Sequence, residues 1–132
     1  MIKKVYLLWH AYRTKELLVI GSLMELDNKK FMFKYETDAE KALKLGCFLP
    51  FRFTNEELYF DSLPHFFEQR ILKSKFNIEK SGINYDNANK LEVLTFFDSV
   101  KNNDNFRIIS EHSYYSLMKA QLEHSGNNIN RR

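Results

Sequence analysis

Residues that could bind a metal ion or act as nucleophiles are few in this sequence and far apart. Imidazole ligands would have to come from four positions, His10, His65, His112 and His124. No two of them lie four residues apart, the spacing with which one helix presents two histidines to zinc. The single cysteine, Cys47, lies in an apolar stretch and has no second cysteine for a disulfide or a Cys-based zinc site. We therefore predict no metal and no cofactor, and a buried structural role for Cys47.

Two pairs of carboxylates have a spacing that acid–base catalysis could use. They are Asp38 with Glu40, and Glu56 with Glu57. The same residue types also begin helices and turns, where their oxygens accept hydrogen bonds from free backbone amides. Neither a glycine-rich phosphate loop nor a G-x-S-x-G or H-E-x-x-H motif accompanies them. The sequence therefore favours a protein that is not an enzyme.

Length and composition are those of one small domain. The chain has 132 residues, 44% of them hydrophobic, and a net charge of +3 from lysines and arginines scattered along it. No apolar run approaches the roughly 20 residues that a membrane-spanning helix needs, and the one near the N-terminus is too short for a secretion signal. We expect a cytoplasmic protein without membrane contact, with a single domain over 1–125 and a disordered polar tail over 126–132.

The hydrophobic pattern predicts an α+β fold. Residues 3–12, 15–26 and 31–36 are rich in β-branched and aromatic residues and are separated by short polar turns, which is typical of an antiparallel meander. Residues 106–110 have the character of a closing strand. Apolar residues at helical spacing predict four helices, at 37–45, 64–74, 87–101 and 113–124. We expect these helices to pack around a small antiparallel sheet.

Local signals predict where the helices begin and end. Thr37 and Glu40 have the spacing of a capping box, and Gly46 suits the left-handed conformation that ends a helix. Pro64 is typical of a helix start. The helix over 87–101 is expected to have Asp86 or Asn87 as its cap.

The segment that follows the first predicted helix and runs into the second is rich in aromatic residues. Residues 49–72 contain five phenylalanines and both prolines of the chain. Pro50 limits residues 47–51 to a short or edge strand, and residues 54–62 predict a turn or a short helix. Aromatic side chains beside an arginine are frequent anchors of protein interfaces.

Five residues are therefore predicted to contact a protein partner: Trp9, Tyr12, Phe51, Arg52 and Phe53. The alternative for the rings is a place in the core. A tryptophan on a strand of so small a protein is usually buried. Phe51 and Phe53 would lie on one face of an extended segment, with Arg52 on the other.

The order of short motifs resembles the N-terminal subdomain of the HipA-like kinase family. Two strands are followed by “FMFKYE” at 31–36, by a helix, by “LPF” at 49–51 and by “LPHFFEQRIL” at 63–72. The last of these is similar to the “FF-x-x-LLP” segment of that family, with Ile71-Leu72-Lys73 where the family has Leu-Leu-Pro. The same order is similar to the N-terminal region of some bacterial proteins that carry a HIRAN domain downstream.

The resemblance implies a binding function. Free-standing versions of this subdomain are HipS-like antitoxins of tripartite toxin–antitoxin systems, in which the small protein binds and neutralises a separate HipA-like serine/threonine kinase toxin. We therefore predict a non-catalytic module that docks where the fused subdomain of such a kinase would sit. Nucleic acid would be bound only indirectly, through the complex.

Two other functions remain open. An accessory module of nucleic-acid metabolism, by analogy with the HIRAN-linked proteins, would stack bases on Trp9, Tyr12 and Phe33. Phosphates would meet three lysines, Lys29, Lys30 and Lys34. A phage or mobile-element protein that binds a host defence factor is permitted by the small, free-standing domain, but no residue selects it.

Overall fold

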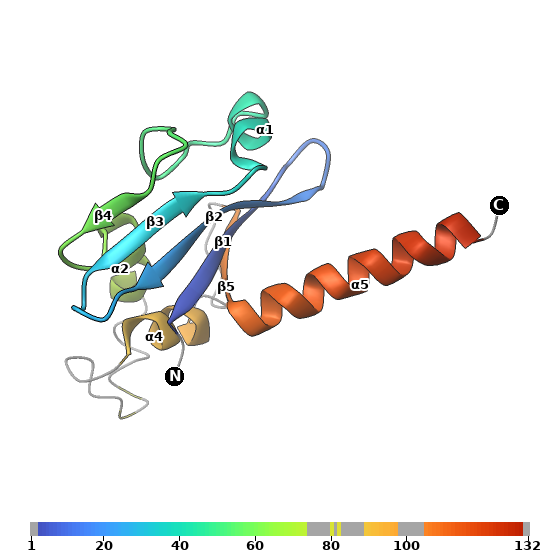
Figure 1. Ribbon diagram of the computed structural model, residues 1–132. Coiled ribbons are helices and arrows are strands. Elements are labelled where there is room, and N and C mark those ends of the chain that lie inside the picture. The colour runs from blue at the N-terminus through green and yellow to red at the C-terminus, as the bar shows by residue number, and fades with distance from the viewer. Residues whose placement is uncertain (1–2, 74–79, 81, 83–88, 98–104, 131–132) are drawn as a thin grey trace.

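The protein has an α+β architecture (Figure 1). The computed structural model describes residues 3–73, 80, 82, 89–97 and 105–130. In this part of the chain a five-stranded antiparallel sheet, with strand order β4-β3-β2-β1-β5, is packed with four helices. This arrangement confirms the predicted fold class. None of the described helices combines the length and the apolar character needed to cross a membrane.

The first three strands form the predicted meander. Their bounds are Lys4–His10 (β1), Leu17–Glu25 (β2) and Phe31–Tyr35 (β3). β1 pairs with β2, and β2 pairs with β3, both in antiparallel orientation. The predicted closing strand is β5 (Phe106–Ser110), which pairs with the free side of β1. β1 is therefore an inner strand, paired on both sides, and β5 is an edge strand.

One strand of the sheet, β4, was not predicted from the sequence. Its bounds are Leu58–Phe60, and it pairs with β3 at the edge of the sheet. The turn or short helix predicted over 54–62 is therefore wrong. Leu58 and Phe60 alternate with the exposed Tyr59, and both pack against the core, which is the pattern of an edge strand.

Buried and exposed side chains alternate along the strands and so define a core face and an outer face of the sheet. Along β3, Phe33 faces the core while Lys34 is exposed. Along β2 the spacing between core residues is two from Leu18 to Ile20 but three from Ile20 to Leu23. A bulge explains the change, because the register with β1 shifts by one residue at this point.

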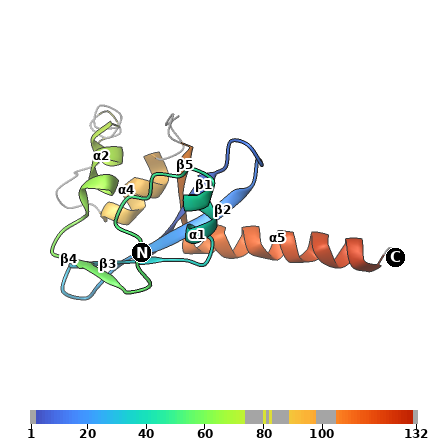
Figure 2. The same cartoon turned by 90° about the horizontal axis from the view of Figure 1, so that it is seen from above.

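The helices lie on both sides of the sheet. Their bounds are Ala39–Lys44 (α1), His65–Lys73 (α2), Lys90–Phe97 (α4) and Glu111–Asn130 (α5). α2 and α4 lie together against one face, and α5 lies against the other and extends past the edge of the sheet (Figures 1 and 2). α1 sits at one end of the sheet beside β2.

Aromatic rings fill much of the core beneath α2. The ring centroid of Phe33 lies 4.9 Å from that of Phe51 and 6.0 Å from that of Phe67. Arg70 of α2 is buried beside them, and its Nη2 donates a hydrogen bond to the carbonyl oxygen of Phe106 at 3.0 Å. That bond ties α2 to β5, so the arginine stabilises the packing of two elements far apart in the sequence.

The start of α1 differs from the predicted capping box. The helix begins after Asp38, and no side chain caps it, so the pairing of Thr37 with Glu40 is wrong. The carboxylate that a cap would use turns back to the sheet instead, because Asp38 Oδ2 accepts a hydrogen bond from the Val19 amide at 3.3 Å. The predicted end is confirmed, since Gly46 has a φ of +95° just after the helix.

The starts of α2 and α4 are set by Pro64 and Asn89. The Pro64 carbonyl accepts from the amides of Phe67 and Glu68, each at 3.0 Å, so the helix predicted to start at Pro64 begins one residue later, at His65. In α4, Asn89 Oδ1 accepts from the amides of Leu91 and Glu92 at 2.9 and 3.1 Å. Asn89 is thus the cap. The predicted caps, Asp86 and Asn87, are wrong and lie outside the described residues.

α5 is longer than predicted at both ends. It follows β5 directly, and Ser110 Oγ accepts a hydrogen bond from the Ser113 amide at 3.2 Å, as an N-cap does. The helix continues to Asn130, so residues 126–130 of the predicted disordered tail are helical, and residues 131–132 lie outside the described part. The assignment of residues 1–125 to a single domain stays a prediction.

Candidate functional site

The predicted partner-binding residues come together at one end of the sheet. β1 ends, β2 begins, β3 ends and β4 begins at this end, so three connecting segments gather there (Figure 1). We call this region the α1 end; it consists of the hairpin turn 11–16, helix α1 and the loop 45–57. Trp9 lies at the edge of this region, near the end of β1.

Two of the five predicted contact residues belong to the core. Trp9 is only 8% exposed and packs in the main hydrophobic cluster. Phe51 is half-buried, and its ring lies 4.9 Å from the ring of Phe60 as well as from that of Phe33. Residues 47–51 form no strand, so the short or edge strand predicted there is wrong.

The Tyr35 side chain fixes the position of Phe51. Its hydroxyl accepts a hydrogen bond from the Phe51 amide at 2.9 Å and donates one to the Phe51 carbonyl oxygen. Burial raises the pKa of Tyr35 to about 12, so the hydroxyl stays protonated and can donate at any physiological pH. Tyr35, the last residue of β3, therefore anchors the loop through both the amide and the carbonyl group of Phe51.

Arg52 and Phe53 follow this anchor and lie on the surface. Arg52 is exposed, and Phe53 is 37% exposed while its ring lies 5.7 Å from that of Tyr35. Both residues are therefore available to a partner. Their backbone follows directly after Phe51, which the Tyr35 hydroxyl holds in place. Phe53 packs on its neighbour with one side and presents the other side to solvent.

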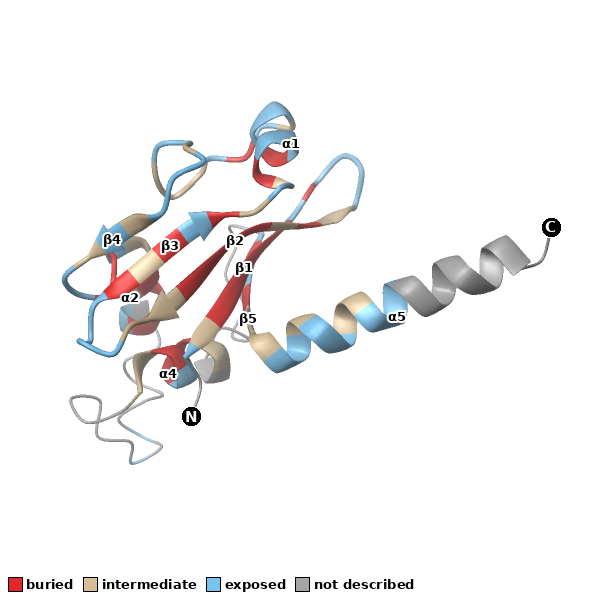
Figure 3. Cartoon of the chain, viewed as in Figure 1, coloured by how far each residue is buried: buried red, intermediate tan, exposed pale blue. Residues whose placement is uncertain are grey.

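Tyr12 and Phe48 are the most exposed rings of the described residues. Tyr12 is 85% exposed in the hairpin turn, and Phe48 is 92% exposed just after α1. Leu43 on α1 is a third exposed apolar side chain of this region. Figure 3 shows the exposed hairpin turn and α1 at the same end of the sheet.

Sequence reasoning identified Tyr12 but missed Phe48. A signal was present, because Gly46 ends α1 in a left-handed conformation and Cys47 then turns into the core. The Cys47 amide donates to the Ala42 carbonyl oxygen at 3.0 Å, which fixes that turn. In an extended segment the next side chain points to the opposite side. A ring that directly follows a buried cysteine in such a segment therefore faces solvent, as Phe48 does.

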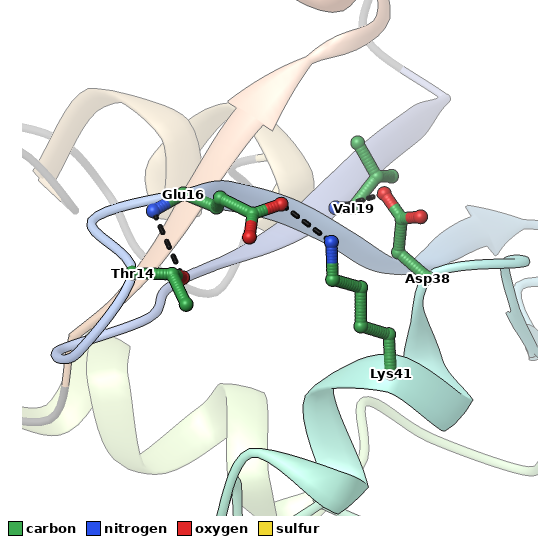
Figure 4. A network of polar contacts seen from close by, with 5 residues as sticks. All are labelled: Thr14, Glu16, Val19, Asp38 and Lys41. Carbon is green, nitrogen blue, oxygen red and sulfur yellow. Dashed lines mark hydrogen bonds and ion pairs between the residues drawn. The ribbon is translucent and has the colours of Figure 1, made fainter.

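Polar contacts tie the hairpin turn to α1 (Figure 4). Glu16 Oε2 and Lys41 Nζ form an ion pair at 2.6 Å, and this contact lowers the pKa of the Glu16 carboxyl. The Glu16 amide lies 3.4 Å from the Thr14 hydroxyl, which accepts from it. The bond from Val19 to Asp38 adds a second link between β2 and the start of α1. The segments that carry Tyr12 and Phe48 are therefore held in a defined relation.

The ionisable groups of the α1 end offer little chemistry. Burial raises the pKa of the Cys47 thiol to about 11, so the thiol is protonated and a poor nucleophile near neutral pH. This result agrees with the predicted structural role of Cys47. Within the described ranges, no three His, Cys, Asp or Glu side chains gather closely enough to hold a metal ion.

Two of the three side chains proposed to stack nucleic-acid bases are not available for that role. Trp9 is buried, and Phe33 is completely shielded from solvent. Lys29 and Lys30 lie in the turn before β3, at the opposite end of the sheet from Tyr12. Lys29 and Lys30 therefore do not form one continuous surface with the remaining ring, Tyr12, and the base-stacking role predicted for Trp9 and Phe33 is wrong.

The chain was compared with models of known protein families and with curated proteins. No family model matches it. No curated protein matches it either.

Proposed function

We propose that this protein is a non-catalytic binding module that docks on another protein through its α1 end. The observation that carries the proposal is the exposure of Tyr12 and Phe48 on two segments that the Glu16–Lys41 ion pair joins. Large aromatic rings are common hot spots of protein interfaces, because each one removes much apolar area from water and has few rotatable bonds to immobilise.

The surroundings of the two rings support a docking surface. Leu43 adds apolar area, while Arg52 and Phe53 extend the surface along the anchored loop. Arginine beside aromatic rings can stack on a partner and form hydrogen bonds in one plane. Because the Tyr35 hydroxyl holds Phe51, the partner would not have to immobilise a free loop, and less conformational entropy would be lost on binding.

The proposed partner is a HipA-like serine/threonine kinase toxin, and the protein would act in the cytoplasm as its antitoxin. The motif order from residues 31–36 to residues 63–72 supports this choice, because it resembles the subdomain that such kinases carry in fused form. Docking at the position of that subdomain would hold the kinase in an inactive arrangement. The proposed inhibition is steric or conformational and needs no catalytic residue from this chain.

An affinity capture followed by a kinase assay tests the proposal. The tagged full-length chain should recover a HipA-like kinase from a lysate of its native cells, and the purified chain should stop autophosphorylation of that kinase. Recovery without inhibition would support assembly and contradict the antitoxin role. Failure to bind a purified HipA-like kinase from the same cells would contradict the choice of partner.

A further inference from the structure

A narrow cleft lies on the face of the sheet that α5 covers. It has a volume of about 250 Å³ and is enclosed by the start of β2, the connection from β3 to α1, and one side of α5. Its lining combines the side chains of Glu36, Asp38 and Tyr114 with four apolar side chains from β2 and α5. The cleft is separate from the exposed rings of the α1 end, which belong to other segments.

The cleft carries two carboxylates that form no ion pair with any described side chain. Each of the four ion pairs among the described residues uses another acidic residue: Asp27, Asp61, Glu16 or Glu40. One oxygen of Asp38 accepts from the Val19 amide, and no described group bonds its other oxygen. The backbone of Glu36 is fixed, because its amide donates to the Ile20 carbonyl oxygen at 2.8 Å.

Tyr114 of α5 lines the cleft and also contacts the sheet. Its ring stacks on Tyr6 with a centroid distance of 3.8 Å and an interplanar angle of 16°. This stack anchors α5 on the sheet and fixes the width of the cleft. Burial raises the pKa of the Tyr114 hydroxyl, and the charges of Glu36 and Asp38 raise it further, so the hydroxyl remains neutral beside them.

Size and lining define what the cleft can hold. Pockets for drug-sized ligands have volumes of roughly 300–1,000 Å³, so this cleft suits one side chain better than a cofactor. Leu17, Val19, Leu117 and Met118 provide apolar walls for a methylene stem. The carboxylates complement a cationic head, and a guanidinium loses less hydration than an ammonium when it leaves water.

We propose that this cleft binds an arginine side chain presented by a protein partner. The stem would lie between α5 and β2, and the guanidinium would meet the carboxylates of Glu36 and Asp38. Paired N–H donors match carboxylate oxygens in geometry, and such charge-assisted bonds are stronger than neutral ones. The inference goes beyond the proposed docking of the α1 end, because it does not depend on which protein supplies the arginine.

A titration of the full-length chain with N-acetyl-arginine amide, followed by amide NMR signals, tests this inference. The neutral isostere N-acetyl-citrulline amide is the matched ligand. Arginine amide should shift the signals of Val19, Glu36, Leu117 and Met118 in a saturable way. Glu36→Gln should weaken that binding by about fivefold, as expected for loss of one partly exposed charge contact. Glu40→Gln, on the exposed side of α1, should leave it unchanged.

Three results would overturn the inference. Citrulline amide could bind as well as arginine amide, which would show that the carboxylates do not select a cation. The shifts could lie outside the cleft. Glu40→Gln could weaken binding as much as Glu36→Gln, which would indicate a general attraction to an acidic surface. The NMR spectrum of each variant also reports whether it is folded, so a loss of binding can be separated from a loss of structure.

Discussion

The hydroxyl of Tyr35 forms two hydrogen bonds with the backbone of a single residue, Phe51, accepting from its amide and donating to its carbonyl oxygen. This contact joins the end of β3 to the loop 45–57, where no ladder of backbone hydrogen bonds is present. The Phe51 ring then completes the aromatic cluster around Phe33. One side chain thus positions both the core and the loop that leads to Arg52 and Phe53.

Tyr35→Phe should destabilise the protein by about 1–3 kcal/mol, because it leaves two partly buried backbone groups of Phe51 without a partner. Urea denaturation followed by circular dichroism measures this change. Tyr115→Phe is the matched control, since Tyr115 is exposed on α5, and it should change stability by less than about 0.5 kcal/mol. Equal effects of the two substitutions would show that the Tyr35 hydroxyl does not anchor the loop.

Gly21→Ala should be more damaging than Gly46→Ala. A Cβ at Gly21 would lie 2.8 Å from the Lys34 carbonyl oxygen and would overlap the buried ring of Phe33, so the sheet would have to shift. We expect a loss of about 2 kcal/mol or more from this overpacking. Gly46 has open space around it and only a positive φ, which predicts a cost of about 1 kcal/mol. Melting temperatures in the reverse order would contradict the described packing of β2 on β3.

Asp38 should stabilise the protein because its side-chain oxygen accepts a hydrogen bond from the Val19 amide, and not because it carries a negative charge. Asp38→Ala removes the acceptor for the Val19 amide and should cost about 1 kcal/mol, whereas Asp38→Asn retains an oxygen and should cost less. Thermal unfolding of the two variants measures the difference. If the asparagine variant were as unstable as the alanine variant, the negative charge would be the stabilising feature.

Stability should fall at alkaline pH through Cys47 and Tyr35. Burial raises the pKa of Cys47 from 9.0 to about 11 and that of Tyr35 from 10.0 to about 12. The unfolded chain therefore loses these protons at lower pH than the folded chain, so the stabilisation is complete below about pH 9 and is lost as the pH rises toward 12. Melting curves between pH 8 and pH 11 test this, with Cys47→Ala as the variant whose slope should be shallower.

The regular part of the fold follows from the sequence. Alternation and turn residues located β1, β2 and β3, and Gly46 and Pro64 marked a helix end and a helix start. Periodicity did not reveal β4, because three residues are too few for a pattern and the aromatic residues in it also suit a helix. Its identity depends on pairing with β3, a contact between distant parts of the chain.

The candidate site was only partly predictable for a related reason. The sequence gives residue types, but whether a ring faces the core or the solvent depends on tertiary neighbours. Phe51 was predicted to contact a partner, with a place in the core as the alternative, and its half-buried ring packs on Phe33. Phe48, two residues before Pro50, was not singled out and is the most exposed ring described. The capping box failed likewise, because Asp38 found a partner in β2 that local spacing does not show.

The central claim is that Tyr12 and Phe48 form the docking surface for a HipA-like kinase. Isothermal titration of the purified kinase with the double variant Tyr12→Ala/Phe48→Ala tests it most directly, with Tyr115→Ala as an exposed aromatic control away from the α1 end. We expect the double variant to remain folded and to bind at least about 30-fold more weakly, as for the loss of two hot-spot rings. The control should bind like the unaltered chain. Unchanged affinity of the double variant would contradict the account.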